Sequence, residues 1–253
     1  MKCVILCAGY GTRLGKLTEN TPKPLLPVAG RPMVDYILDR LAEAGITSGV
    51  LVTNHRFYEH FVRWAGSATG SVELQIVDDG TTSNETRLGA IGDLDLGLRA
   101  ADIREDFIVV NGDNLFTFSL SPIVSFFREK GNTIVLYDVG SKDVARQMGI
   151  AETDEQGRVV GFVEKPADPP STCVSIGIYL YQAGVRDLIR RYLEQGNPAD
   201  RTGDFVAWLY RQTTVYGYFV DRAAGIWYDI GTPEQYYEAD RLMAELRSGG
   251  GDR

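Results

Sequence analysis

Short apolar runs alternate with segments of helical apolar spacing along the first half of this 253-residue chain. Residues 3–8 are continuously apolar, which is typical of a strand covered on both faces in a parallel sheet. Further strands are expected at residues 49–53, 72–77 and 107–110, and helices between Pro32 and Gly45 and at residues 55–65 and 88–101. Repeated strand–helix–strand order implies right-handed βαβ units. The sequence therefore predicts an α/β fold with a Rossmann-like, mostly parallel sheet and helices on both faces.

The second half of the chain has a different pattern. The sequence Asp154-Glu155-Gln156-Gly157 lies between two short apolar runs and favours a β-hairpin. We expect the hairpin strands at residues 150–153 and 158–162, two more strands at 174–181 and 215–220, and a helix at 185–193. This pattern predicts a smaller lobe of mixed structure, with a substrate cleft between the two halves of one domain.

The charge balance excludes some partners. A formal net charge of −8 argues against nucleic-acid binding, which normally requires a basic surface.

The apolar run after Lys2 ends at Gly9, too short for a signal-peptide core or a membrane span, so we expect a cytoplasmic protein without membrane contact. Cys3 and Cys7 are expected to be core residues, and the two histidines lack the spacing of zinc ligands.

A glycine-rich loop follows the first expected strand. Gly9 and Gly11 let backbone N–H groups approach phosphate oxygens closely, and Arg13 adds a planar fork of donors. Lys23 lies between Pro22 and Pro24, which restrict where its ammonium group can point. Since ligands of parallel sheets gather beyond the carboxyl ends of the strands, this loop and Asp113, after the fourth expected strand, belong to one edge.

Four motifs together resemble the sugar-phosphate nucleotidyltransferases, also called nucleotide-sugar pyrophosphorylases, such as the glucose-1-phosphate thymidylyltransferases. The motifs are the segment 6–33, with its Gly-x-Gly-Thr-Arg-Leu and Pro-Lys-Pro-Leu pieces, then Gly112-Asp113-Asn114, Glu164-Lys165-Pro166, and 227–234. The resemblance extends to about residue 246 and implies the nucleotide-diphospho-sugar transferase type of fold. It implies transfer of a nucleoside monophosphate from a nucleoside triphosphate to a sugar 1-phosphate, with Mg²⁺ as cofactor and pyrophosphate as the second product.

The resemblance also implies residue roles. Arg13, Lys23 and Asp113 are the expected catalytic residues, and Asp113 and Asp229 the expected ligands of Mg²⁺. The expected nucleotide-binding residues are Leu6, Ala8, Gly9, Gly11, Thr12, Arg13, Gly89 and Asp113. The expected sugar-phosphate-binding residues are Gly149, Glu164, Lys165, Gly177 and Tyr179.

The domain organisation follows from these roles. Residues 1–247 are expected to form a single nucleotidyltransferase domain, in which residues 1–115 bind the nucleotide. Residues 116–247 bind the sugar phosphate and supply the second metal carboxylate, and residues 248–253 are expected to be a disordered tail. In the final motif, Thr232 and Pro233 fit the N-cap and N1 positions of a last helix at residues 234–246.

Two departures from the family pattern leave the substrates open. Residues 79–89, where the nucleobase is normally read, lack the glutamine of thymidylyl- and uridylyl-transferring members, and carry Asn84, Glu85 and Arg87 instead. The usual asparagine before the Gly-Ile-Tyr strand is absent from residues 172–175. A cyclitol phosphate, phosphocholine or a phosphonate therefore stays open as the acceptor. The sequence also leaves open whether the protein forms a homo-oligomer.

Other classes of protein are less consistent with the sequence. A nicotinamide-dependent dehydrogenase needs a third glycine where Leu14 stands, and no helix can begin before Pro22 and Pro24. A regulatory nucleotide-binding protein without turnover stays open, although all the charged residues implied by the resemblance are present. Individually, Asp113 could be a turn residue, and Glu164 with Lys165 a solvated surface pair.

Overall fold

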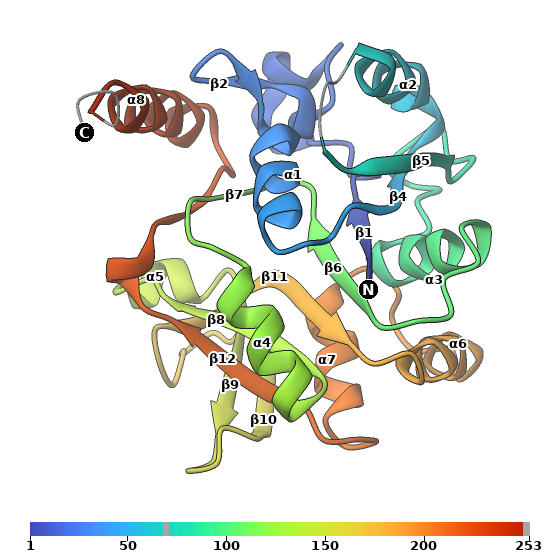
Figure 1. Cartoon of the computed structure of the whole chain (residues 1–253), viewed down its shortest axis with the longest axis vertical. Coiled ribbons are helices and arrows are strands. Elements are labelled where there is room, and N and C mark those ends of the chain that lie inside the picture. The colour runs from blue at the N-terminus through green and yellow to red at the C-terminus, as the bar shows by residue number, and fades with distance from the viewer. Residues whose placement is uncertain (68–70, 250–253) are drawn as a thin grey trace.

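The computed structural model of the chain describes residues 1–67 and 71–249. Four parallel strands lie side by side in the order β6-β1-β4-β5. They are β1 (Lys2–Leu6), β4 (Ser48–Thr53), β5 (Glu73–Asp78) and β6 (Phe107–Asn111). Each lies where the apolar runs of the sequence predict a strand, and the carboxyl ends of β1 and β6 point to the same edge of the sheet (Figure 1).

Helices cover both faces of this sheet. They are α1 (Met33–Glu43), α2 (Tyr58–Ser67), α3 (Ala90–Ala100), α4 (Ser121–Lys130), α6 (Val185–Glu194) and α7 (Thr202–Leu209). Cys3 and Ile5 of β1 pack in one core with α1, α2 and α4, whereas Val4 packs in a second core with α3, α6 and α7. The predicted α/β class with helices on both faces is confirmed, and Cys3 and Cys7 are buried core residues, as predicted.

Strands from the second half extend the same sheet. They are β8 (Thr133–Asp138), β9 (Gly149–Thr153), β10 (Val159–Glu164), β11 (Cys173–Tyr181) and β12 (Tyr216–Val220), which complete a nine-stranded sheet. β11 runs antiparallel to β6 and joins the two halves, and β9 and β10 form the predicted hairpin. The sheet is therefore parallel in its first half and mixed in its second, and the sequence analysis has no counterpart for β8, α4 or α7.

Several short elements and the long helix α8 complete the described chain. They are β2 (Pro27–Val28), β3 (Arg31–Pro32), β7 (Asn114–Phe116), α5 (Lys142–Ala145), β13 (Trp227–Asp229), α8 (Pro233–Gly249) and the 3-10 segments Thr12–Thr18, Lys23–Leu25, His55–Phe57 and Arg222–Ala224. The expectation that no helix begins before Pro22 and Pro24 was wrong, because a 3-10 segment starts at Thr12. Gly11 permits this start by adopting a left-handed backbone with φ of 62°.

The last helix begins with a reciprocal cap. The Gln235 backbone N–H donates to Thr232 Oγ1 at 3.3 Å, and Gln235 Oε1 accepts from the Thr232 backbone N–H at 3.0 Å. Thr232 is thus the N-cap that the sequence predicts.

The helix includes residues 248 and 249, which were expected to belong to a disordered tail, and residues 250–253 lie outside the described residues. Within the described part of the chain, no helix is both long and apolar enough to cross a membrane.

Gly49→Ala is expected to destabilise the protein by about 3 kcal/mol, because the new methyl group overpacks the sheet. An ideal Cβ at Gly49 would lie 2.1 Å from the Cys3 carbonyl oxygen, and a backbone atom in a ladder cannot move aside alone. Gly66→Ala is the matched control, since nothing lies within 4 Å of its Cβ position in α2. Thermal melts of both variants test this, and equal melting temperatures would contradict it.

Candidate active site

A cavity of about 440 Å³ opens at the edge of the sheet where β1 and β6 end. The loop from Cys7 to Leu14 forms one wall, and Asp113 after β6 lies opposite. All eight residues predicted to bind the nucleotide line this cavity: Leu6, Ala8, Gly9, Gly11, Thr12, Arg13, Gly89 and Asp113. The structure therefore brings these residues together around a single space.

Lys23 and Asp113 form an ion pair at the base of this cavity. Lys23 Nζ donates to Asp113 Oδ2 at 2.9 Å, and the Lys23 side chain is only 8% exposed, whereas that of Asp113 is 46% exposed. The neighbouring Lys23 ammonium holds the pKa of Asp113 below its usual range, and this outweighs the effect of burial. Asp113 is thus an ionised carboxylate facing open space, with a cation already beside it.

A second cavity of about 170 Å³ adjoins the first and shares three of its lining residues, Arg13, Asn111 and Asp113. It lies among β9, β10, β11, β13 and the start of α7. All five residues predicted to bind the sugar phosphate line this cavity: Gly149, Glu164, Lys165, Gly177 and Tyr179. Asp229, an expected Mg²⁺ ligand, lines it as well. The residues assigned to the two substrates therefore line two spaces that meet at Arg13 and Asp113.

The polar groups of the second cavity differ in how they are held. Burial raises the pKa of Glu164, and the nearby Lys165 opposes this shift. The Tyr179 hydroxyl donates to Thr202 Oγ1 at 2.9 Å and accepts from Ser175 Oγ at 3.4 Å. Lys165 itself has a positive φ of 50°, which is uncommon for a residue with a side chain and is concentrated at functional sites.

Asp229 reaches the junction through a small ladder between β13 and β7. Trp227 Nε1 donates to Asn114 Oδ1 at 2.7 Å, and Asn114 Nδ2 donates to the Gly177 carbonyl at 3.2 Å. Burial raises the pKa of Asp229, Lys23 opposes the shift, and the charge of Asp113 adds to it. Asp229 and Asp113 are therefore close enough to influence each other, as two ligands of one cation would be.

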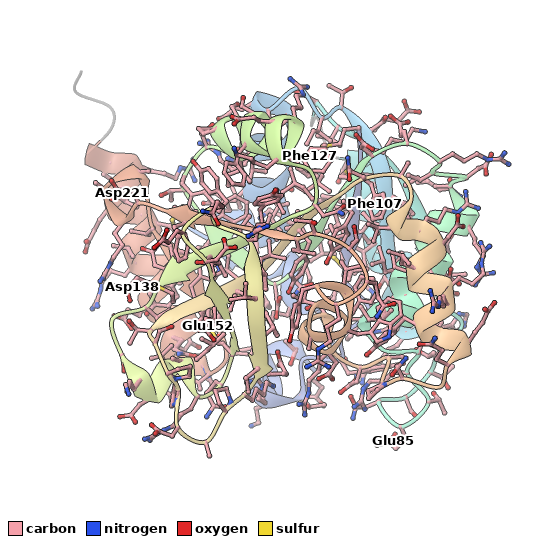
Figure 2. All side chains as sticks on the ribbon, turned by 90° about the horizontal axis from the view of Figure 1, so that it is seen from below. Glu85, Phe107, Phe127, Asp138, Glu152 and Asp221 are labelled. Atoms are coloured by element: carbon pink, nitrogen blue, oxygen red, sulfur yellow. The ribbon has the colours of Figure 1, made fainter. Side chains whose placement is uncertain are left out.

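Part of the segment expected to read the nucleobase forms a wall of the larger cavity, together with Asp200, which no sequence motif includes. Arg87 Nε donates to Asp200 Oδ1 at 2.7 Å, and both residues line the larger cavity with Asn84. Glu85, from the same loop, is exposed and lies at the outer tip, away from the cavity (Figure 2). Gly89 packs against the chain beside Asp200, since an ideal Cβ there would lie 2.5 Å from the Ala199 carbonyl oxygen. Nothing in the local sequence signals that Asp200 joins this wall.

Two buried carboxyl groups lie beside this wall. Burial, then the neighbouring charge of Asp79, raises the pKa of Asp93 to about 8, and Asp93 lines the larger cavity. Burial also raises the pKa of Asp79, and the hydrogen bond that Asp79 Oδ1 accepts from the Thr81 backbone N–H opposes this shift. Near neutral pH, Asp93 is therefore protonated.

Asp93→Asn is expected to stabilise the protein more at pH 8.5 than at pH 5. The folded pKa of Asp93 lies above the unfolded value of about 3.9, so its contribution to stability is full below that value and is lost as pH rises toward the folded pKa. Asparagine does not ionise, so it removes this loss of stability at high pH. Melting temperatures of both proteins at the two pH values test this, and a pH-independent difference would contradict it.

The comparisons with known proteins agree with this geometry. A family model described as nucleotidyl transferase matches residues 2–245. Two of the most similar relatives are the low-salt glycan biosynthesis nucleotidyltransferase of Haloferax volcanii, 31% identical over 98% of this chain, and the mannose-1-phosphate guanylyltransferase of Mycobacterium tuberculosis, 35% identical over 92% of it. The chain spans 67% and 62% of the length of these two relatives.

Solved structures share the fold over nearly the whole chain. UDP-glucose pyrophosphorylase in complex with UDP-glucose has a TM-score of 0.82 at 22% identity, over 97% of this chain and 98% of that one. A candidate glucose-1-phosphate thymidylyltransferase from Bacillus anthracis, in complex with a sucrose, has a TM-score of 0.82 at 25% identity, over 96% and 95% of the two chains. With the family model matching residues 2–245, this chain belongs to the nucleotidyl transferase family.

Proposed function

We propose that this protein transfers a nucleoside monophosphate from a nucleoside triphosphate to a sugar 1-phosphate, and releases pyrophosphate. The observation that carries the proposal is the meeting of two cavities at Arg13 and Asp113. One cavity is lined by the glycine-rich loop, and the other by hydroxyl and charged side chains. The names of the relatives, which include mannose-1-phosphate guanylyltransferase and UTP–glucose-1-phosphate uridylyltransferase, support the same class of reaction.

The reaction needs two polyanions to meet in line. An oxygen of the sugar phosphate attacks the α-phosphorus of the triphosphate, and the bond from that phosphorus to the pyrophosphate oxygen breaks. Pyrophosphate leaves with the electron pair of that bond, so no side chain has to form a covalent intermediate. The work of the protein is positioning and charge neutralisation, for which Arg13 lies where the cavities meet, Lys23 lines the larger cavity and Lys165 lines the smaller one.

Two carboxylates that line the smaller cavity fit Mg²⁺. Asp113 and Asp229 offer hard oxygen donors, and Mg²⁺ is commonly held by one or two carboxylates together with substrate phosphates and waters. Among residues 1–67 and 71–249, no cluster of three or more His, Cys, Asp or Glu side chains has the arrangement of a metal site. We therefore propose that these two carboxylates bind the cation with the nucleotide, and that the bound cation neutralises phosphate charge.

The substrates themselves are tested by Mg²⁺-dependent pyrophosphate release. Each of ATP, CTP, GTP, UTP and dTTP is mixed with a panel of sugar and cyclitol phosphates, phosphocholine and a phosphonate. Turnover with one pair and formation of the matching nucleotide sugar would support the proposal. Tight nucleotide binding by calorimetry without turnover on any pair would instead indicate a regulatory protein, and no nucleotide binding at all would overturn the proposal.

The cellular location stays a prediction. We propose cytoplasmic residence on the sequence expectation alone. Cell fractionation with an antibody against the protein would test it.

A further inference from the structure

We infer that Gly203, in the first turn of α7, is a positioning residue that fixes the Glu164 carboxylate in the acceptor cavity. The inference rests on the function proposed above, because it assigns Glu164 to the acceptor. No family motif in the sequence includes Gly203, and it lies 39 positions after Glu164.

The backbone gives no reason for glycine at this position. Gly203 lies inside α7 with an ordinary helical backbone, and alanine has a higher intrinsic helix propensity than glycine. A glycine in such a place is therefore explained by what approaches it. An ideal Cβ at Gly203 would lie 1.9 Å from Glu164 Oε2 and 3.2 Å from the Phe162 ring.

A second glycine approaches the same carboxylate oxygen. An ideal Cβ at Gly149, the first residue of β9, would lie 2.8 Å from Glu164 Oε2 and 2.4 Å from Phe162. The Glu164 carboxylate thus lies between the start of β9 and the first turn of α7. Side chains on either glycine would compete for the space that this carboxylate occupies.

Packing, rather than a hydrogen bond, holds the carboxylate in this slot. Within the described residues, no hydrogen bond reaches either oxygen of Glu164, although burial raises the pKa of its carboxyl group. Its lone pairs are therefore free to accept hydrogen bonds from a ligand in the cavity, beside Lys165 and Tyr179. Two hydroxyls of a sugar-like acceptor are the natural donors for such a carboxylate.

The clash at Gly203 involves the far end of a flexible side chain. Alanine at this position would rotate the Glu164 carboxylate out of its slot and leave the helix and strands in place. Gly203→Ala should therefore lower kcat/KM for the acceptor about tenfold, within the range for loss of a hydrogen bond to a charged group. The KM for the nucleoside triphosphate should stay at its wild-type value. The melting temperature should equal or exceed that of the wild-type protein.

A double-mutant cycle tests the route through Glu164. Gly203→Ala, Glu164→Ala and the double variant are assayed on the substrate pair that the wild-type protein uses. If Gly203 acts through Glu164, the double variant has the same kcat/KM for the acceptor as Glu164→Ala alone. Gly184→Ala, at the N-cap of α6 with nothing within 4 Å of the Cβ position, is the matched control with unchanged kinetics.

The outcomes separate the inference from the proposed function. If the wild-type protein turns over no pair of nucleotide and acceptor, the proposed function fails. The inference is then tested by a crystal structure of Gly203→Ala, which shows whether the Glu164 carboxylate has moved. An active wild-type protein with a Gly203→Ala variant of unchanged kcat/KM for the acceptor would overturn the inference. Additive losses in the double variant, or a large drop in melting temperature for Gly203→Ala, would overturn it as well, because both indicate a structural role independent of Glu164.

Discussion

Asp113→Asn and Asp229→Asn should each lower kcat by about 10²–10³, because each removes one negative charge from the proposed Mg²⁺ site while keeping the shape of the side chain. Asp113 lines both cavities and Asp229 lines the smaller one, and the charge of Asp113 raises the pKa of Asp229. The double variant should lose little more than the worse single variant, since one cation needs both ligands. Steady-state pyrophosphate release at saturating substrates measures the loss.

The control for these variants is Asp187→Asn. Asp187 lies on α6 with its side chain 83% exposed, and it lines neither cavity. Asp187→Asn therefore makes the same change of charge outside the proposed site. Its kcat should match that of the wild-type protein. Near-wild-type kcat for Asp113→Asn at saturating Mg²⁺ would remove Asp113 from the proposed metal site, and the same result for Asp229→Asn would remove Asp229.

Local sequence predicts the first half of the fold because β1, β4 and β6 contain contiguous apolar runs and β5 alternates polar and apolar residues. β6 is an example, since its residues from Phe107 to Val110 are fully buried in the sheet. β8 carries the same signal, with Ile134 to Leu136 fully buried, and could have been found by the same criterion. α7 is different, because no side chain caps its N-terminus and Gly203 weakens its helical pattern.

In the candidate site too, some residues can be predicted from local sequence and others cannot. Residues carried by local motifs, such as Arg13, Lys23 and Glu164, line the expected cavities because a motif fixes both the element and the residue type. Contacts between distant segments follow from the path of the chain and leave no local pattern. The pair Arg87–Asp200 joins residues 113 positions apart, and Gly203 meets Glu164 only because α7 packs across the end of β10.

Lys23→Met should lower kcat/KM for the nucleoside triphosphate by about 10²–10³, through loss of a cation that faces the phosphates. The same substitution should have an opposite effect on metal binding without nucleotide. In the structure, the Lys23 ammonium lies 2.9 Å from Asp113 Oδ2, one of the oxygens proposed to hold Mg²⁺. The ammonium and the metal ion therefore compete for one carboxylate, and they repel each other across a largely buried site.

Removal of this competition should tighten the binding of Mn²⁺, used as a spectroscopic substitute for Mg²⁺, by about tenfold in the absence of nucleotide. Electron paramagnetic resonance titration of free Mn²⁺ measures the change, and Lys130→Met, an exposed lysine paired with Glu129, is the control. Loss of turnover together with tighter metal binding would show that Lys23 occupies the carboxylate until the nucleotide arrives. Loss of turnover with unchanged metal affinity would mean that Lys23 acts on the phosphates alone, and that Asp113 accepts the cation without displacing it.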